Sequence, residues 1–567
     1  MSLQRLGPLV TLLVFLGLAS YQLNLPGLHY DEAFEVVPTM QLMLHQPVVT
    51  FRDNGIWLGG QRFPLMTQDY IGAINTLLAC PFFLGMGISV FSLRLMALAI
   101  GLLTLALSCR LARELQGRLA GSLAAALLAA SPSFVFWSRQ GVFVTSVTAA
   151  IGLAAAWSWL RWWRCGGQRY ALLGAFLFGL GIYAKLLFVW LIVGLGAAAA
   201  IILTARRLWQ RHPVLAGAPS RAPGFAWLGC ALATLLGSAP LLVYNLQTGG
   251  TLSNIGGNLT TSYYGANNLA FVPNLLERMK QFAAVITGSH LWYLGVSLPN
   301  WLDLVLFLLT LASVLVLLAG PARGSAAARR ALVPFVVIAV VIAASCVTVS
   351  ALWVTHFAVI APWPALAIAV GVAAGVRQLR GASRLARTTL VATTALVVGA
   401  ACASDVLSDV RYHQSLYLSG GLGAHSDAVE KLADWLLVSS RLPAAADRPA
   451  GTRPALKVAA MDWGIAAPVT FLTLGRITPV ETFGYAWQTD ADFESRLRPF
   501  VQDPATIYLW RAPDEIIFDR SDAFRAVYEP LGLEEDIAEA FYERSGRPVL
   551  GATRLVPRGQ ALNPPRP

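Results

Sequence analysis

The stretch "SLRLMALAIGLLTLALSCRL", Ser92 to Leu111, decides the fold class. It is an apolar run of the roughly 20 residues that a helix needs to cross a bilayer, with Arg94 near one end and Arg110 at the other. Similar runs recur along the first 403 residues. The whole chain is 56% hydrophobic and 13% charged, whereas soluble domains carry roughly 25% charged residues. The sequence therefore predicts a polytopic α-helical membrane protein.

Charge divides the chain into two parts. Residues 1–404 hold 25 Lys and Arg but 8 Asp and Glu, whereas residues 405–567 hold 17 and 22. The basic residues of the first part gather in clusters between apolar runs, which is typical of cytoplasmic loops rather than of nucleic-acid binding. We therefore expect a multi-pass protein of the inner (cytoplasmic) membrane, with a cytoplasmic N-terminus, contacts to membrane lipids and no nucleic-acid partner.

The arginine clusters also settle an ambiguous region. Residues 69–113 have room for two spans. Two spans would place the basic cluster of Arg110, Arg113 and Arg118 on the same side of the membrane as the acids near residue 31, whereas one span places them on opposite sides. We therefore predict one span at 92–111 and an interfacial helix at 69–89. About 11 spans result, with outer loops at 25–91 and 245–300. The predicted spans lie near 6–24, 92–111, 118–134, 140–161, 170–185, 187–205, 224–244, 301–320, 331–350, 358–376 and 388–404.

The C-terminal residues 405–567 have a different pattern. "ALKVAAMDWGIAAPVTFL" and "DPATIYLW" indicate short strands, and "SDAVEKLADWLLVSS" and "FRAVYEPLG" indicate helices. We predict a soluble extracytoplasmic α/β domain that follows a transmembrane domain at 1–404. The chain's six cysteines are scattered, with no spacing for a disulfide framework or a metal site, and are interpreted as small core residues.

An acidic segment follows the first span. "LPGLHYDEAFEVV", Leu25 to Val37, contains Asp31, Glu32 and Glu35, and the first 404 residues hold five other acids. Acids at the start of a helix are favoured by the helix dipole, so Asp31 and Glu32 could form a capping, solvated face. The alternative is catalytic, because a carboxylate in low-dielectric surroundings is a good general base.

Three cations depart from the positive-inside pattern. Arg94, Arg139 and Lys185 fall at the outer ends of predicted spans, and Lys185 is one of four lysines in the chain. Each could extend its charge to lipid headgroups. Each could instead bind a phosphate at the outer interface, because intramembrane charges are rare and usually functional.

Four further polar residues are candidates for substrate binding. Asp69 and Tyr70 open the predicted interfacial helix, His356 lies in a short outer turn, and His290 ends the long outer loop. A lone histidine is more often structural, and no spacing declares a metal site, although a divalent cation could be bound by groups that meet in space. Carboxylates, cations and aromatics gathered beside lipid suit a lipid-phosphate substrate. Two other classes stay open: a multi-span transporter or flippase, and an assembly protein whose outer tail binds a partner.

Several short motifs occur in a familiar order. They are the acidic pair after span 1, "S-x-R-L" opening span 2, "SPSFVFWSRQ", "GLGIYAK" and a late "HF-x-x-x-x-P-x-P-A-L". This order resembles the GT-C glycosyltransferases, in particular the protein O-mannosyltransferase and aminoarabinose transferase group. The resemblance covers most of residues 1–404.

The resemblance implies an activity and a set of roles. These enzymes take a sugar from a polyprenyl-phosphate carrier and transfer it, with inversion, to an acceptor, which here could be a protein, lipid or glycan. Asp31 would be the base with Glu32 beside it, and Arg94 and Lys185 would contact the donor phosphate. The family's "K/H-P-P-L" segment appears as "RFPLMTQDY", which keeps Pro64 and has Arg62 as its basic residue.

Overall fold

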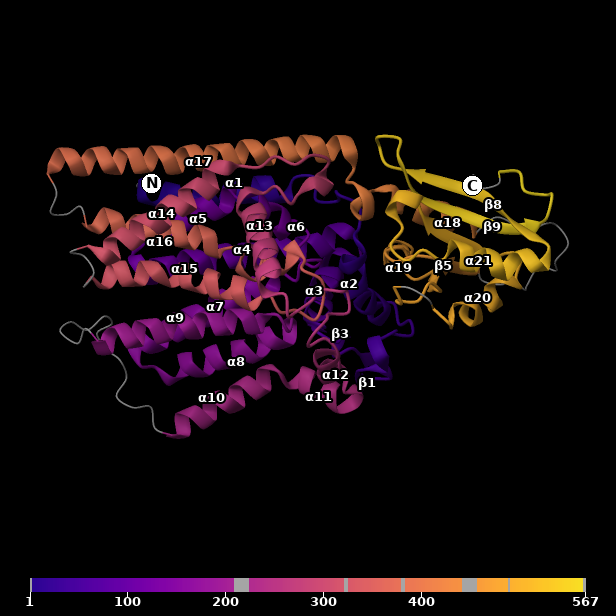
Figure 1. Cartoon of the computed structure of the whole chain (residues 1–567), viewed down its shortest axis with the longest axis horizontal. Coiled ribbons are helices and arrows are strands. Elements are labelled where there is room, and N and C mark those ends of the chain that lie inside the picture. Colours follow the sequence, from indigo (N-terminus) through magenta and orange to yellow (C-terminus); the bar gives the residue numbers. More distant parts are fainter. Residues whose placement is uncertain are drawn as a thin grey trace.

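The computed structural model describes residues 3–208, 224–320, 325–378, 383–440, 456–487 and 490–563. Figure 1 shows a bundle of long, roughly aligned helices, with a unit of sheet and short helices at one end. The described helices of the bundle are α1 Leu3–Ser20, α2 Tyr30–Met43, α3 Ile74–Met86, α4 Val90–Gln116, α5 Arg118–Ala130, α6 Pro132–Arg139, α7 Val147–Cys165, α8 Gln168–Ala184, α9 Phe188–Leu208, α10 Gly224–Gly237, α11 Ala239–Thr248, α12 Gly250–Gly257, α13 Phe271–Thr287, α14 Trp301–Ala319, α15 Ala326–Ala344, α16 Trp363–Gln378 and α17 Arg384–Ser419.

Four described helices are long and apolar enough to cross a membrane by themselves: α4, α14, α15 and α17. The number rises to seven if each of three bent helix pairs counts as one span. The chain is thus a mostly helical membrane protein, as predicted. The total of 11 spans stays a prediction.

The bent pairs occur where the sequence suggested unbroken spans. The bend is 68° between α5 and α6, 60° between α10 and α11, and 45° between the 3-10 turn η4 (Val354–Ile360) and α16. Pro132 and Pro240 stand in the first turn of α6 and α11, where a missing amide proton is tolerated. Proline can therefore begin a new helix at these points, but it cannot continue the old one.

The outer loop between α1 and α4 corrects one expectation. A helix was predicted over 69–89, but residues 56–72 form two small hairpins, β1 Ile56–Leu58 with β2 Gln61–Phe63 and β3 Met66–Gln68 with β4 Ile71–Gly72. α3 begins only at Ile74. Asp69 and Tyr70 therefore lie in the turn between β3 and β4, and they do not open the helix.

Two further boundaries differ from the sequence prediction. The predicted span at 140–161 begins instead at Val147, because residues 140–146 form turns in which Thr145 has a φ of 53°. α17 continues without interruption through residue 404, where a domain boundary was placed. That boundary stays a prediction.

The C-terminal residues form a five-stranded mixed sheet with helices packed on it. The strand order is β6-β5-β7-β9-β8, in which β5 runs parallel to both neighbours and β9 antiparallel to both of its own. Buried apolar side chains lie on both faces of the sheet. The elements are α18 Ala428–Ser439, β5 Val458–Ala460, α19 Ala466–Leu472, β6 Val480–Glu481, α20 Phe493–Val501, β7 Ile507–Arg511, α21 Ser521–Tyr528, β8 Leu533–Tyr542 and β9 Pro548–Pro557.

The sheet unit docks on the outer-loop helices. Phe471 of α19 joins a buried cluster with residues of α2, α3 and α4, and its ring centroid lies 5.9 Å from that of Phe83. Gly27 lies so close to the backbone of Ser426 that a Cβ at that position would overlap it. The acidic segment after α1 is thus enclosed between the helical bundle and the C-terminal unit.

Candidate active site

α2 positions the acidic segment. His29 caps the helix: its Nδ1 accepts from the amide of Asp31 at 3.2 Å, and its own amide donates to Oε2 of Glu32 at 3.3 Å. Asp31 and Glu32 thus occupy the first turn, where the helix dipole favours negative charge. The predicted helix is confirmed, and Glu32 takes part in its capping box, but Glu32 and Glu35 are buried, so this part of the segment is not a solvated face.

Glu32 is paired with Arg94 in the protein interior. The Nε and Nη2 atoms of Arg94 donate to the two carboxylate oxygens of Glu32 at 3.1 and 3.0 Å, and both side chains are 0% exposed. The remaining guanidinium donors of Arg94 bind the carbonyl oxygens of Leu23, Pro26 and Gly27. The pair therefore fastens α4 to α2 and to the chain before it.

Arg139 is also fully buried. Its Nη2 donates to the carbonyl oxygens of Gln22 and Leu25, and its Nη1 lies 3.2 Å from Nδ1 of His413 on α17. In this structure neither Arg94 nor Arg139 offers an exposed guanidinium to a phosphate.

Asp31 has the opposite environment to Glu32. Its side chain is 36% exposed, and it shares one face of α2 with Glu35, four residues later. The charge of Lys185 acts on both carboxylates, although no ion pair within 4.0 Å joins Lys185 to either in the described chain. Burial raises the pKa of Asp31, and the nearby His29 and Lys185 partly offset the rise. The three ionisable groups are thus near enough to influence one another electrostatically.

Glu35 is the innermost of the three groups. It is 3% exposed, and its Oε2 accepts a 2.6 Å hydrogen bond from Nδ2 of Asn75 on α3. Burial raises the pKa of Glu35 well above its usual range, more than the hydrogen bond from Asn75 lowers it. Burial therefore favours the protonated form of this carboxyl group.

Lys185 is placed by a strand-like contact at the end of α8. It pairs with Ile71 of β4 in an isolated antiparallel bridge, and the amide of Leu186 donates to the carbonyl of Tyr70 at 2.9 Å. Its Nζ lies 3.4 Å from the hydroxyl of Thr145 and is nearly buried. The outer-loop hairpin and the end of α8 together therefore fix the backbone that carries the ammonium group.

Asp69 and Tyr70 form the neighbouring wall. Asp69 accepts hydrogen bonds from the hydroxyl of Tyr244 at 2.6 Å and from Nη2 of Arg52 at 2.9 Å, so it holds the turn in place. Burial raises the pKa of the Tyr70 hydroxyl, and Asp31 and Tyr264 add to the rise. The Tyr70 hydroxyl is therefore near enough to Asp31 for the carboxylate charge to act on it, and its role in substrate binding stays a prediction.

The C-terminal unit contributes another wall. The hydroxyl of Tyr30, beside Asp31, donates to Glu481 at 2.9 Å, and Tyr485 donates to the same carboxylate at 2.7 Å. Tyr263 from the long outer loop donates to the carbonyl of Tyr485. These contacts close one side of the site with groups that lie more than 200 residues apart in the chain.

The two candidate histidines have structural partners. The Nδ1 atom of His356 lies 3.2 Å from Nη2 of Arg278, and its Nε2 atom lies 3.3 Å from the hydroxyl of Ser350. Lys185 is near enough for its charge to act on the His356 ring. His290 pairs with Ser133 at 2.8 Å and packs on Trp137. His356 therefore borders the site, whereas none of the contacts of His290 involves another candidate residue.

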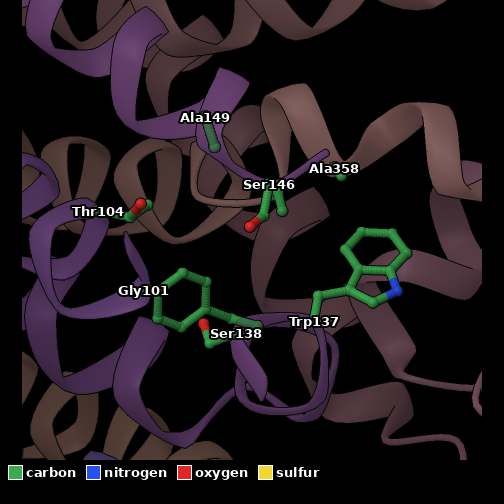
Figure 2. Close-up of a pocket in the computed structure, with 9 residues that line it drawn as sticks. Gly101, Thr104, Trp137, Ser138, Ser146, Ala149 and Ala358 are labelled. Carbon is green, nitrogen blue, oxygen red and sulfur yellow. The ribbon is translucent and has the colours of Figure 1, made fainter. Parts of the chain in front are cut away.

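A small internal cavity lies between the helices of the bundle. Figure 2 shows Thr104, Ser138 and Ser146 around it, with Trp137 at one side. Its lining comes from α4, α6, α7 and the residues around η4, and contains none of the predicted site residues. Three hydroxyl groups make it suitable for an internal water, but it is not the reaction site.

Within the described part of the chain, no group of three or more His, Cys, Asp or Glu side chains could hold a metal ion. Binding of a divalent cation with the help of substrate oxygens stays a prediction.

The sequence did not single out several residues of this region. They come from loops and strands far apart in the chain, so neither spacing nor periodicity linked them to Asp31. Glu35 alone had a usable signal, because it stands one helical turn after Asp31. The residues are Glu35, Asn75, Thr145, Tyr264, Glu481 and Tyr485.

Comparison with known proteins shows which family and which folds this chain resembles. Residues 74–241 match the family model described as dolichyl-phosphate-mannose-protein mannosyltransferase. Apo ArnT from Cupriavidus metallidurans is similar with a TM-score of 0.56 at 13% identity, over 97% of both chains. The structure of the same protein bound to undecaprenyl phosphate is similar with a TM-score of 0.50 at 13% identity, over 99% of both chains. The Archaeoglobus fulgidus oligosaccharyltransferase in its apo form is similar with a TM-score of 0.50 at 13% identity, over 90% of this chain and 69% of the oligosaccharyltransferase chain. No curated protein matches the sequence.

The fold is therefore that of the GT-C membrane glycosyltransferases. The resemblance predicted from the sequence motifs is confirmed by the family model and by these structures. In particular, the fold of ArnT extends over nearly the whole chain, including the C-terminal unit that the motifs did not cover.

Proposed function

We propose that this protein is a membrane glycosyltransferase that moves a sugar from a polyprenyl-phosphate donor to an acceptor hydroxyl on the outer face of the membrane. One observation carries the proposal: the partly exposed carboxylate of Asp31 lies close enough to Lys185 for the lysine charge to act on it, in a fold that matches ArnT over 97% of both chains. The ArnT structure with undecaprenyl phosphate supports a lipid-phosphate donor.

The proposed reaction is a single displacement. Asp31 accepts the proton of the acceptor hydroxyl as its oxygen forms a bond to the anomeric carbon. The bond between that carbon and the phosphate oxygen breaks, and polyprenyl phosphate leaves with the bonding electrons. Lys185 stabilises the charge of the leaving phosphate. The configuration at the anomeric carbon is inverted.

The structure suggests how the remaining candidates contribute. Arg94 and Arg139 are buried and hydrogen-bonded within the protein. We therefore assign them the role of fixing α2 and of adding positive potential to the site. Direct contact of either guanidinium with a phosphate would require the chain to move. Tyr70 and His356 border the site and are proposed to contact substrate. Asp69 holds the turn that carries Tyr70. His290 is the weakest candidate, because its polar contacts are satisfied elsewhere.

The orientation in the membrane follows from the same proposal. Asp31 and Lys185 belong to the outer side, the N-terminus and the basic loops to the cytoplasmic side, and the C-terminal unit to the outside, where it covers the site. A protein, lipid or glycan would enter there as acceptor. The comparisons give no support to a transporter or flippase.

Sugar transfer in proteoliposomes tests the proposal. The purified protein is supplied with radiolabelled polyprenyl-phosphate sugar and a mixture of membrane acceptors, with and without EDTA. We expect Asp31→Asn to reduce transfer by at least about 100-fold, the usual contribution of general-base catalysis. Asp53→Asn is the matched control, because Asp53 is an exposed acid of the same outer loop. Transfer by Asp31→Asn at the wild-type rate would remove Asp31 from the role of base.

A further inference from the structure

The hairpin β1–β2 exposes three consecutive apolar side chains. Ile56, Trp57 and Leu58 are 43%, 63% and 58% exposed. The hairpin turns at Gly59 and Gly60, both with positive φ, and no other part of the protein lies within 4 Å of a Cβ built at either position. An exposed strand of this composition would be an aggregation risk in water, so its exposure calls for a partner.

This apolar surface continues onto a helix of the bundle. The amide of Gly55 donates to Oε1 of Gln247 at 3.1 Å, and Nε2 of Gln247 donates to the carbonyl of Gly55 at 3.0 Å. Gln247 is on α11, the second half of the bent apolar pair α10–α11, and Figure 1 shows β1 beside α11 and α12. The neighbouring Leu246 and Leu252 are 88% and 70% exposed. The hairpin thus extends a surface that belongs to a membrane-spanning unit.

The polar residues of the hairpin fit the lipid–water boundary. The guanidinium carbon of Arg62 lies 5.0 Å from the centre of the Trp57 ring, and its Nη1 binds Asp53 at 3.0 Å. Tryptophan is enriched at the headgroup level, and arginine places its charge among headgroups while its stem covers apolar surface. A protein partner could also cover apolar residues, but continuity with the lipid-facing helix favours the bilayer.

We propose that the β1–β2 hairpin is a membrane-interface anchor whose partner is the outer-leaflet lipid surface. Ile56, Trp57 and Leu58 insert at the boundary between headgroups and acyl chains, and Arg62 contacts lipid phosphates.

The anchor is firmly connected to the candidate site. Oδ1 of Asn54 accepts from the amides of Leu65 and Met66 at 2.8 and 3.0 Å, and Arg52 binds Asp69. Lipid contact at the hairpin therefore fixes the height of the Asp69–Tyr70 turn relative to the membrane.

Spin labelling tests the anchor without any assay of sugar transfer. In the full chain carrying Cys165→Ser, which removes the exposed native thiol, a nitroxide is attached at Trp57→Cys or at the control Leu531→Cys. Leu531 is 59% exposed in the C-terminal unit, so it matches Trp57 in exposure. In liposomes of phosphatidylglycerol and phosphatidylethanolamine, the measurement is the collision rate of each label with oxygen divided by its collision rate with a water-soluble nickel complex. We expect this ratio to be at least about threefold higher for the label at 57 than for the label at 531.

Two results would overturn the proposal. One is equal accessibility to the nickel complex at positions 57 and 531 in liposomes, which would place the hairpin in water. The other is immobilisation of the label at 57 only in native membranes, which would indicate a protein partner. Thermal unfolding of both labelled variants shows whether the substitutions preserve the fold.

Discussion

Asp31 and Glu32 are neighbours in the chain but have different environments. Glu32 points inward and is neutralised by Arg94, with both side chains fully buried. The Asp31 side chain is 36% exposed, and the charge of Lys185 acts on it. A general base needs an accessible carboxylate, whereas a fully paired one serves to fix geometry. The structure thus supports Asp31 for the proton transfer, a choice that the sequence alone could make only by family resemblance.

Glu32→Gln should destabilise the protein strongly. Removing one partner of a buried ion pair leaves the other charge uncompensated, at a cost of about 3–5 kcal/mol. The measurement is the temperature at which the detergent-solubilised protein loses its monodisperse peak. Asp31→Asn is the control, because its side chain is partly exposed, and its unfolding temperature should stay near that of the wild type. An unchanged unfolding temperature for Glu32→Gln would show that the pair does not stabilise α2.

Glu35 should make stability depend on pH. Burial raises its pKa from 4.5 to about 8, so between these values the folded state holds a proton that the unfolded state has released. The folded state therefore loses stability as pH rises from about 4.5 to 8. Glu35→Gln removes the titrating group but keeps a side chain that Asn75 can contact. The difference in unfolding temperature, variant minus wild type, should increase from pH 5 to pH 8, and a constant difference would contradict the shifted pKa.

At the scale of elements, the contact between β4 and the end of α8 places Lys185. β4 is two residues long, and its bridge to Lys185 joins chain segments more than 100 residues apart. Gly72 permits this approach, because a Cβ at that position would overlap the backbone and ring of Tyr183. The helix α8 was predictable from its apolar run, but a two-residue strand in a loop leaves no periodic signal.

Gly72→Ala should displace Lys185 and lower transfer. The methyl group would push Tyr183 and the end of α8 away from β4, and we expect at least about a tenfold loss of kcat/KM for the lipid-linked donor. Gly59→Ala tests the effect of an added methyl group at an open position of the same loop, where no steric overlap arises. Gly59, unlike Gly72, has a positive φ, so alanine there strains the backbone; the unfolding temperature of both variants is therefore measured, and activities are compared well below the lower of the two. Equal activity of the two variants would show that the β4–α8 contact is not needed.

At the scale of the whole molecule, the site is enclosed by docking of the C-terminal unit on α2. The contacts are Tyr30 with Glu481, Phe471 with the α2–α3 cluster, and the close approach of Gly27 to Ser426. They join residues from both ends of the chain, so neither part forms the enclosed site by itself. Under the proposed function, the C-terminal unit would cover the reaction, a role that its own sequence pattern did not indicate.

Gly27→Ala should loosen this docking. The added methyl group would overlap the carbonyl of Ser426, and the bond from the Gly27 amide to the carbonyl of Gly420 would be disturbed. We expect at least about fivefold faster proteolytic cleavage between the helical bundle and the C-terminal unit. Gly546→Ala, at an open turn of the C-terminal unit, controls for a general effect of glycine replacement. Unchanged cleavage of Gly27→Ala would mean that the interface adapts to the methyl group.

The sequence by itself determined the membrane class, the main apolar helices, the α2 helix with its acidic start and the order of motifs that resembles the GT-C enzymes. These features are local, because apolar runs, capping residues and charge clusters act over a few helical turns. The tertiary structure alone decided that Arg94 pairs with Glu32, that Glu35 is buried against Asn75 with the charge of Lys185 acting on Asp31 and Glu35, and that Asp69 lies in a hairpin turn. Pairing and burial depend on which distant segments meet, and a single sequence does not contain that information in its spacing.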